Sequence, residues 1–434
     1  MFTRLMDSLA VTEALSRVFS DASVLQAMLD FEVALARAEA RCGVIPAQAA
    51  ETIAAVARAE SFGSADIAEL VRFSLRAGTP AIPLVQALKE KVRAKDPSAA
   101  GVVHWGATSQ DVVDTALVLL LSNCRALLAA DHDRIQRGLR RLSDEHADTV
   151  MLGRTLLQAA PPVTFGLKAA GWYAALRRGW WRVDSRFTES QYLQFGGASG
   201  TLAALGERGI SVSEAVAQEL GLKCPDAPWH AYPDRLAALL AALSIYTASL
   251  GKVALDIALL MQHEVGEAAE PGGDGRGGSS SMPHKHNPTA CMLTIAAAKR
   301  TPGLMANFLN GMLQEHERAL GGWQSEWTTV QGMLQAAGVA LESMAEVIEG
   351  LKVDPQRMRR NIEATQGTVF AEKALVQLAE TMGRDDARRL VEETLRKTGS
   401  PPDLPGLLSP ESYLGSAEAF RVRLLEEEQQ DAIR

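Results

Sequence analysis

Residues 236–251 read LAALLAALSIYTASLG and carry no charged side chain between Arg235 and Lys252. The apolar residues of this stretch continue at helical spacing over about 235–264. Its sixteen uncharged residues are fewer than the roughly 18 to 20 that a helix needs to span a membrane. We therefore expect a buried core helix, and no association of the protein with a membrane.

Five other segments show the same helical spacing of apolar residues. They are 25–40, 111–142, 164–185, 289–310 and 327–351. Few stretches of alternating β-branched residues lie between them, so the sequence predicts an all-α fold. Long apolar helix faces cannot be covered within one helix, which favours a bundle whose surfaces continue into contacts between subunits.

Turns rich in glycine and proline divide the chain into three expected domains. These turns lie at 78–83, 101–108, 196–200, 271–288 and 399–405. We expect an N-terminal helical domain at 1–105, a central long-helix bundle at 106–352 and a C-terminal helical domain at 353–434.

Composition and charge argue against several classes of function. The chain has 434 residues, of which 47% are hydrophobic, and its 44 Lys and Arg against 52 Asp and Glu give a net charge of -8. These values suit a globular protein, and the acidic balance argues against nucleic acid as a partner. An acidic protein with an anionic substrate must gather its Arg and Lys locally in a pocket.

The cysteines and the first residues favour the cytoplasm. Cys42, Cys124, Cys224 and Cys291 are widely spaced, with neither CxxC pairs nor a dense disulfide framework. The opening MFTRLMDSLA lacks a basic region followed by an apolar run, so we expect no secretory signal.

The segment 277–288, GGSSSMPHKHNP, combines a glycine- and serine-rich start with a lysine, two histidines and an asparagine between prolines. Composition alone favours a flexible linker. However, Met282-Pro283 and Asn287-Pro288 restrict the backbone on both sides of residues 284–286. The polar groups between the prolines should therefore be held in place.

The pattern GSSxMPxKxNP, from Gly278 to Pro288, resembles the signature of the fumarase and aspartase superfamily. The resemblance implies a three-domain helical fold that assembles into a homotetramer with active sites shared between subunits. It assigns proton transfer to Ser279, and it assigns carboxylate binding and carbanion stabilisation to Lys285 and Asn287. A serine hydroxyl needs nearby cations or N–H groups to act this way, and Lys285 could supply such charge.

The segment 104–111, HWGATSQD, precedes a helical pattern. One interpretation is structural, with Thr108 or Ser109 capping the helix and acidic residues in its first turn. The superfamily resemblance of HxGATSxD adds substrate binding by Thr108 and Ser109, with His104. Both interpretations are compatible, because free N–H groups at a helix start suit an anion.

The segment 153–161, GRTLLQAAP, is similar to the superfamily stretch GRTHLQxAxP, which assigns Thr155 and Gln158 to substrate binding. Relatives place a catalytic His after the Thr and pair it with a Glu four residues beyond the NP of the signature. Here these positions are Leu156 and Met292. A paired loss leaves no buried, unpartnered charge, which indicates a site rebuilt for different proton chemistry.

Among the superfamily, the chain most resembles the carboxymuconate cycloisomerases, which also lack the His. The similarity extends over about residues 20–395, and His286 stands where those relatives usually have Arg. It implies ring closure of 3-carboxy-cis,cis-muconate to a carboxymuconolactone, in protocatechuate (β-ketoadipate) catabolism, on a small tricarboxylate and without a cofactor. The alternatives are an eliminating lyase like adenylosuccinate lyase and a non-catalytic helical scaffold.

Three weaker signals have competing interpretations. Residues 263–267, HEVGE, depart from the HExxH zinc motif, so we expect a solvated helix end and no metal. Arg318 lies where adenylosuccinate lyases of the same superfamily have a substrate-binding arginine, so it could bind a substrate carboxylate. The alternative is a surface ion pair between Arg318 and an acid three or four residues away on the same helix. Trp323 and Trp327 lie one helical turn apart and are expected to pack in the core, and the alternative is that they shape the substrate site. No phosphate-binding glycine motif is present, which argues against a nucleotide cofactor.

Overall fold

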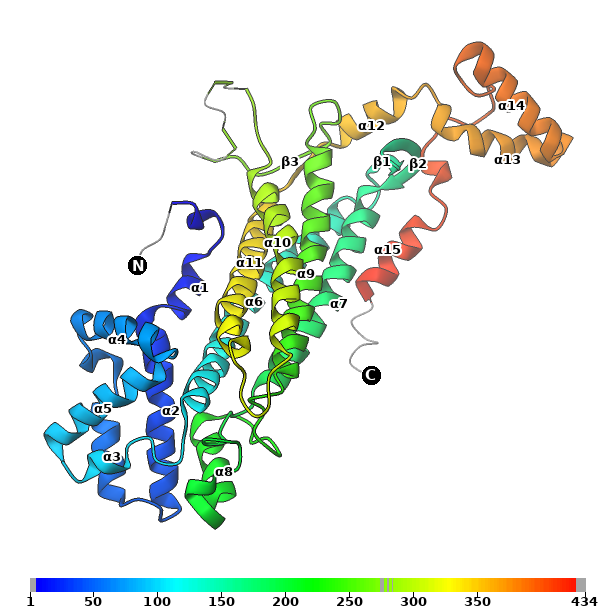
Figure 1. Ribbon diagram of the computed structural model, residues 1–434. Coiled ribbons are helices and arrows are strands. Elements are labelled where there is room, and N and C mark those ends of the chain that lie inside the picture. Colours follow the sequence, from blue (N-terminus) through cyan, green and yellow to red (C-terminus); the bar gives the residue numbers. More distant parts are fainter. Residues whose placement is uncertain (1–4, 274–276, 279–280, 283, 427–434) are drawn as a thin grey trace. The chain divides into compact units, whose positions relative to one another are not determined.

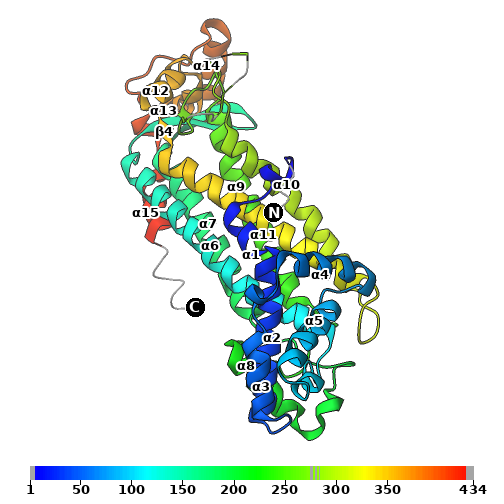
Figure 2. The ribbon, with the colours of Figure 1, turned by 90° about the vertical axis from the view of Figure 1, so that its left-hand side faces the viewer.

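The computed structural model describes residues 5–273, 277–278, 281–282 and 284–426 (Figures 1 and 2), and helices dominate it. The helices are α1 (Glu13–Val18), α2 (Asp21–Arg41), α3 (Ala47–Val56), α4 (Ser64–Ala77), α5 (Ala81–Lys95), α6 (Ser109–Glu145), α7 (Phe165–Ser190), α8 (Gly209–Leu220), α9 (Asp234–Leu260), α10 (Thr289–Gly311), α11 (Gly322–Gly350), α12 (Pro355–Glu363), α13 (Ala371–Met382), α14 (Arg384–Thr398) and α15 (Ala417–Glu426). The short strands are β1 (Val150–Thr155), β2 (Gln158–Thr164), β3 (Ala268–Ala269) and β4 (Lys352–Val353). The predicted helical fold is confirmed.

Each segment with helical spacing lies largely within one helix. The segment 25–40 lies in α2, 111–142 in α6, 164–185 in α7, 235–264 in α9, 289–310 in α10 and 327–351 in α11. The largest differences are at helix ends. The helix α9 stops at Leu260, and α11 begins at Gly322, five residues before the predicted start.

The chain forms two compact units, and the long helices contribute to both. Unit 1 consists of residues 1–130, 180–248 and 297–340, and unit 2 of 131–179, 249–296 and 341–434. The helices α6, α7, α9, α10 and α11 each have one part in each unit. Within each unit these parts lie alongside one another (Figures 1 and 2). The three-domain division at about 105 and 352 stays a prediction.

The core of unit 1 is built around α2, which packs against α3 and α8. Leu29, Phe31 and Leu35 on α2 are fully buried, and the Phe31 ring meets Phe195 edge to face at 6.1 Å between centroids. The side chain of Ser20 accepts a hydrogen bond from the N–H of Ser23 and so caps the helix. This core supports the start of α6.

In unit 2 the antiparallel hairpin β1–β2 packs against the C-terminal helices. Val150 and Leu152 of β1 share a buried cluster with Ile362 and Phe370. The register pairs Val150 with Thr164 at one end and Thr155 with Gln158 at the other, next to the turn. Sequence patterning did not predict this hairpin.

Two helices, α6 and α9, are long and apolar enough to cross a membrane by length and composition. In their most apolar windows 50% and 61% of the residues, respectively, are buried inside the protein. On α9, Leu239, Leu243 and Tyr246 are fully buried. Length alone therefore does not rule out a membrane span for α9, contrary to the argument from its sixteen uncharged residues. Its burial inside the protein confirms the expected core helix.

Candidate active site

The predicted site residues fall into both units, and each group is described by itself. Unit 1 contains His104, Thr108, Ser109 and Arg318, and unit 2 contains Thr155, Gln158, Lys285 and Asn287. Ser279 lies outside the described residues.

The first group gathers at the start of α6. The carbonyl of Thr108 accepts hydrogen bonds from the N–H groups of Asp111 and Val112, at 3.0 and 3.4 Å. In return, the Asp111 carboxylate accepts the Thr108 N–H at 3.1 Å. This geometry confirms the helix start and makes Thr108 the residue before the first helical turn. Carboxylate binding by Thr108 and Ser109 stays a prediction.

Asp111 also holds a second segment against this helix start. Its fully buried carboxylate accepts the side-chain amide of Gln194 at 3.1 Å and the N–H groups of Gly196 and Gly197 at 3.1 and 2.9 Å. A Cβ added at Gly197 would lie 2.8 Å from the carbonyl oxygen of Gly106, so only glycine fits this approach. Burial raises the pKa of Asp111, although its hydrogen bonds oppose the shift. The sequence predicted acidic residues in the first turn of this helix, and Asp111 is one of them, but it did not predict this role.

Arg318 fastens the same two segments together. Its Nε donates to the carbonyl of Ala198 at 2.9 Å, its Nη1 to Oε1 of Gln110 at 2.6 Å, and its Nη2 to the carbonyl of Gly197. The expected alternative, an ion pair within one helix surface, is therefore wrong. At least three donors of the guanidinium are used inside the protein, and its contact with substrate stays a prediction.

Buried acids lie behind this helix start. The indole N–H of Trp323 donates to Asp114 at 2.7 Å, and Trp323 meets Trp327 edge to face at 4.8 Å between centroids. Burial raises the pKa of Asp114 to about 7, and burial with the charge of Asp114 raises that of Glu326 to about 8. The core position expected for Trp323 is confirmed, since it is buried.

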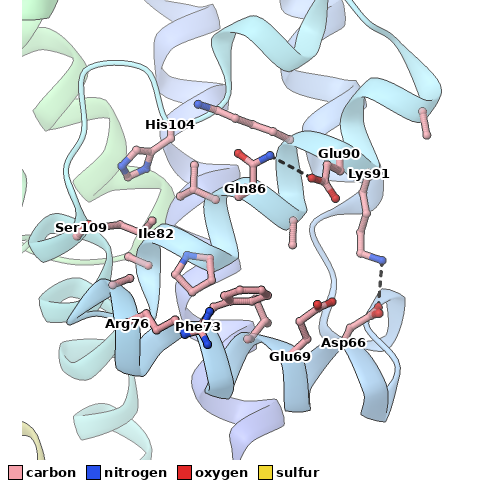
Figure 3. A pocket seen from close by; sticks show the side chains of 18 residues that line it. Asp66, Glu69, Phe73, Arg76, Ile82, Gln86, Glu90, Lys91, His104 and Ser109 are labelled. Atoms are coloured by element: carbon pink, nitrogen blue, oxygen red, sulfur yellow. Dashed lines mark hydrogen bonds and ion pairs between the residues drawn. The ribbon is translucent and has the colours of Figure 1, made fainter.

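A pocket of about 1040 Å³ opens beside the helix start. Residues of α4 and α5 form most of its wall, and His104 and Ser109 lie on the side of α6 (Figure 3). Phe73 and Ile82 supply apolar surface, and charged residues from α4 and α5 complete the lining. The cations among them are Arg76, Lys89 and Lys91, and the acids are Asp66, Glu69 and Glu90. The pocket thus combines apolar walls with a balanced set of charges, in which Lys91 pairs with Asp66 at 3.4 Å while Arg76 and Lys89 are the other cations.

In unit 2, Thr155 and Gln158 close the hairpin, and both are exposed. Between them, Leu156 and Leu157 have φ angles of 49° and 64°, a backbone region that favours glycine and asparagine. The side chain of Leu156 is 96% exposed and Met292 is 53% exposed. Neither position is buried within one chain, and the interpretation of the paired replacement as a site rebuilt for different proton chemistry stays a prediction.

The ends of the 277–288 segment meet. The Asn287 N–H donates to the carbonyl of Gly277 at 2.8 Å, and the Asn287 side chain to that of Gly278 at 3.5 Å. Glu270 accepts the first N–H groups of α10, from Ala290 and Cys291, at 3.1 and 2.8 Å. These bonds hold Asn287 and the start of α10 in place, while holding of the side chains at 284–286 by the flanking prolines stays a prediction. Lys285 in this segment is exposed.

The HEVGE stretch differs in part from its expected solvated helix end. His263 and Glu264 are exposed just beyond α9, as expected. Glu267 is fully buried and forms a two-pronged ion pair with Arg154, at 2.6 and 2.9 Å, so that part of the expectation is wrong. In the described ranges, no group of three or more His, Cys, Asp or Glu side chains could hold a metal ion.

Comparisons with known proteins place the chain among lyases. The lyase family matches residues 9–303. The 3-carboxy-cis,cis-muconate cycloisomerase of Pseudomonas aeruginosa is 46% identical, over 98% of this chain and 96% of that protein. The crystal structure of 3-carboxy-cis,cis-muconate lactonizing enzyme from Pseudomonas putida matches with a TM-score of 0.92 and 42% identity, over 99% of both chains. Nitrosuccinate lyase of Streptomyces davaonensis is 37% identical, over 92% of this chain and 89% of that protein.

Proposed function

Because this chain belongs to the lyase family, and within it to the group of the 3-carboxy-cis,cis-muconate cycloisomerases, we propose that it converts 3-carboxy-cis,cis-muconate to a carboxymuconolactone. The observation that carries the proposal is the 46% identity to the Pseudomonas aeruginosa enzyme over nearly the whole of both chains. The corresponding pathway is protocatechuate catabolism, and the expected location is the cytoplasm.

The reaction is an internal addition. One carboxylate oxygen of the substrate forms a C–O bond with a carbon of the double bond. The electron pair of that double bond moves toward a second carboxylate and gives an aci-carboxylate, and the neighbouring carbon then takes a proton. The enzyme must hold three carboxylates, stabilise the extra negative charge and supply one proton, and none of these steps requires a redox cofactor.

We assign these tasks to the residues of the two groups. Ser279 donates the proton and Lys285 stabilises the developing charge. The carboxylates are held by His104, Thr108, Ser109, Thr155, Gln158, Asn287 and Arg318. The exposure of Thr155, Gln158 and Lys285 in one chain is consistent with a site completed by other chains, and we propose a homotetramer.

The direct test mixes the purified protein with 3-carboxy-cis,cis-muconate and follows the loss of ultraviolet absorbance as the conjugated diene disappears. We expect turnover, with a lactone as the product by mass spectrometry. No turnover of this substrate would overturn the proposal. Release of fumarate from succinyl substrates would instead favour an eliminating lyase.

A further inference from the structure

An acid–imidazole pair lies next to the pocket, and its acid, Glu32, has no part in the assignments above. Glu32 on α2 and His104 are 72 residues apart in the sequence, and Oε1 of Glu32 lies 2.6 Å from Nδ1 of His104. The Glu32 side chain is 1% exposed and that of His104 is 16% exposed. A buried carboxylate bonded to a ring nitrogen fixes the imidazole orientation and favours a proton on Nδ1.

The other ring nitrogen of His104 is available to a ligand. His104 lines the pocket beside Ser109 (Figure 3), and within the described part of the chain Nε2 has no hydrogen-bond partner. With Nδ1 bonded to Glu32, an imidazolium has one N–H left to donate. That N–H would make a charge-assisted bond to a carboxylate, which is stronger than a neutral one.

We propose that Glu32 is a positioning residue that keeps His104 protonated and oriented, so that Nε2–H of His104 donates to a substrate carboxylate bound in this pocket. The inference rests on the proposed function, because it names how one carboxylate of that substrate is held. If this carboxylate gains charge in the aci-carboxylate, the bond strengthens as the reaction proceeds and contributes to kcat as well as to KM.

The acids that face His104 favour its protonated form. Burial of the ring disfavours the charge, and so does Lys89 on α5. The charge and hydrogen bond of Glu32 on α2 favour it, as does the charge of Asp111 on α6. The net effect raises the pKa of His104. Charged His104 is therefore present to higher pH than for an exposed histidine, and deprotonation at still higher pH removes the positive donor.

A second glutamate on the same helix provides a matched control. Glu39 lies two helical turns after Glu32 and is fully buried, and within the described residues neither of its carboxyl oxygens has a hydrogen-bond partner. Burial, followed by the charge of Glu32, raises the pKa of Glu39 to about 9, so this carboxyl is neutral at pH 7. A glutamine has nearly the same shape, so Glu39→Gln should leave His104 unchanged.

The first experiment needs no turnover. Histidine labelled with 15N is followed by NMR through a pH titration of the full-length wild type, Glu32→Gln and Glu39→Gln, with circular dichroism as the check on folding. We expect the His104 titration to move to lower pH in Glu32→Gln and to stay in place in Glu39→Gln. Adding tricarballylate as a tricarboxylate probe should perturb Nε2 in the wild type, and this perturbation should be weaker in Glu32→Gln. An unmoved titration in folded Glu32→Gln overturns the proposal, whether or not carboxymuconate is the substrate.

The second experiment measures the pH profile of kcat with 3-carboxy-cis,cis-muconate. In Glu32→Gln the loss of activity on the alkaline side should begin at lower pH, with kcat at pH 8 reduced roughly 10- to 100-fold. Glu32→Asp should recover part of the loss, since it keeps the charge. A Glu32→Gln profile identical to wild type would refute the positioning role, whereas inactivity of the wild type would refute the proposed function alone.

Discussion

Arg318 illustrates how one side chain can link a helix start to a distant turn. Its guanidinium joins Gln110 to the carbonyls of Gly197 and Ala198, and Asp111 lies 4.0 Å from Nη2. The arrangement is planar and three-way, and a lysine ammonium cannot reproduce it. The residue therefore has a structural task in addition to any contact with substrate.

We expect Arg318→Lys to reduce the free energy of unfolding by roughly 1–3 kcal/mol, because two carbonyls and an amide lose donors and Asp111 loses a nearby charge. Urea unfolding measures this loss. A surface variant such as Arg389→Lys, whose ion pair with Asp386 is exposed, serves as the control and should change little. Unchanged stability of Arg318→Lys together with a raised KM would show that Arg318 acts only on substrate.

Glu39 gives a prediction about pH and stability. The unfolded chain releases this proton near pH 4.5 and the folded chain keeps it until about 9, so rising pH within this window favours unfolding. Glu39→Gln removes the effect. Its stability gain over wild type should be near zero below pH 4.5 and should grow by up to about 1.4 kcal/mol per pH unit above it. Chemical unfolding at pH 5 and pH 8 checks this, and an equal difference at both would contradict it.

At the scale of elements, the hairpin β1–β2 places two leucines in a turn that ordinarily carries Asn-Gly. A non-glycine residue in the left-handed region costs about 1–2 kcal/mol. Because Leu156 is exposed, no burial of its side chain within one chain offsets this backbone strain. Contact of this tip with another chain, where relatives would carry their catalytic histidine, would account for it.

Replacing Leu156-Leu157 by Asn-Gly should relieve the backbone and stabilise the chain by about 1–2 kcal/mol in urea unfolding. Activity should fall at the same time, because the apolar tip is removed from the proposed shared site. Leu313 is also exposed and provides a control, since Leu313→Asn should neither raise the free energy of unfolding nor lower the activity. Lower stability of the Asn-Gly variant would show that the leucines stabilise the fold.

The elements also show what periodicity can and cannot predict. Long helices such as α2 and α9 follow from many apolar positions that repeat along one face. The hairpin escaped prediction because its strands are short and its turn carries leucines in place of the usual turn residues. The pairs of Glu267 with Arg154 and of Glu32 with His104 join residues 113 and 72 positions apart, and no local pattern encodes such contacts.

For the whole molecule, the fold and family could be predicted from the sequence, while the arrangement of the site is only partly visible in one chain. Motifs located the segments 104–111, 153–161 and 277–288, and the structure gives a defined local geometry to the first two and joins Gly277 to Asn287 in the third. Several long helices carry large exposed apolar side chains, among them Trp181 on α7, Ile245 on α9 and Leu309 on α10. Such surfaces on helices of a bundle are typical of contacts between subunits.

A shared active site predicts that two inactive variants can restore activity in each other. Ser279→Ala should lower kcat by orders of magnitude while the fold survives, and so should His104→Ala. If the 277–288 and 104–111 segments of one site come from different chains, mixed tetramers contain some sites with both residues intact. Unfolding and refolding the two variants together should therefore recover a measurable part of the wild-type rate, whereas each variant refolded alone stays inactive. Mixtures that form tetramers by sedimentation but remain inactive would show that a single chain supplies both segments.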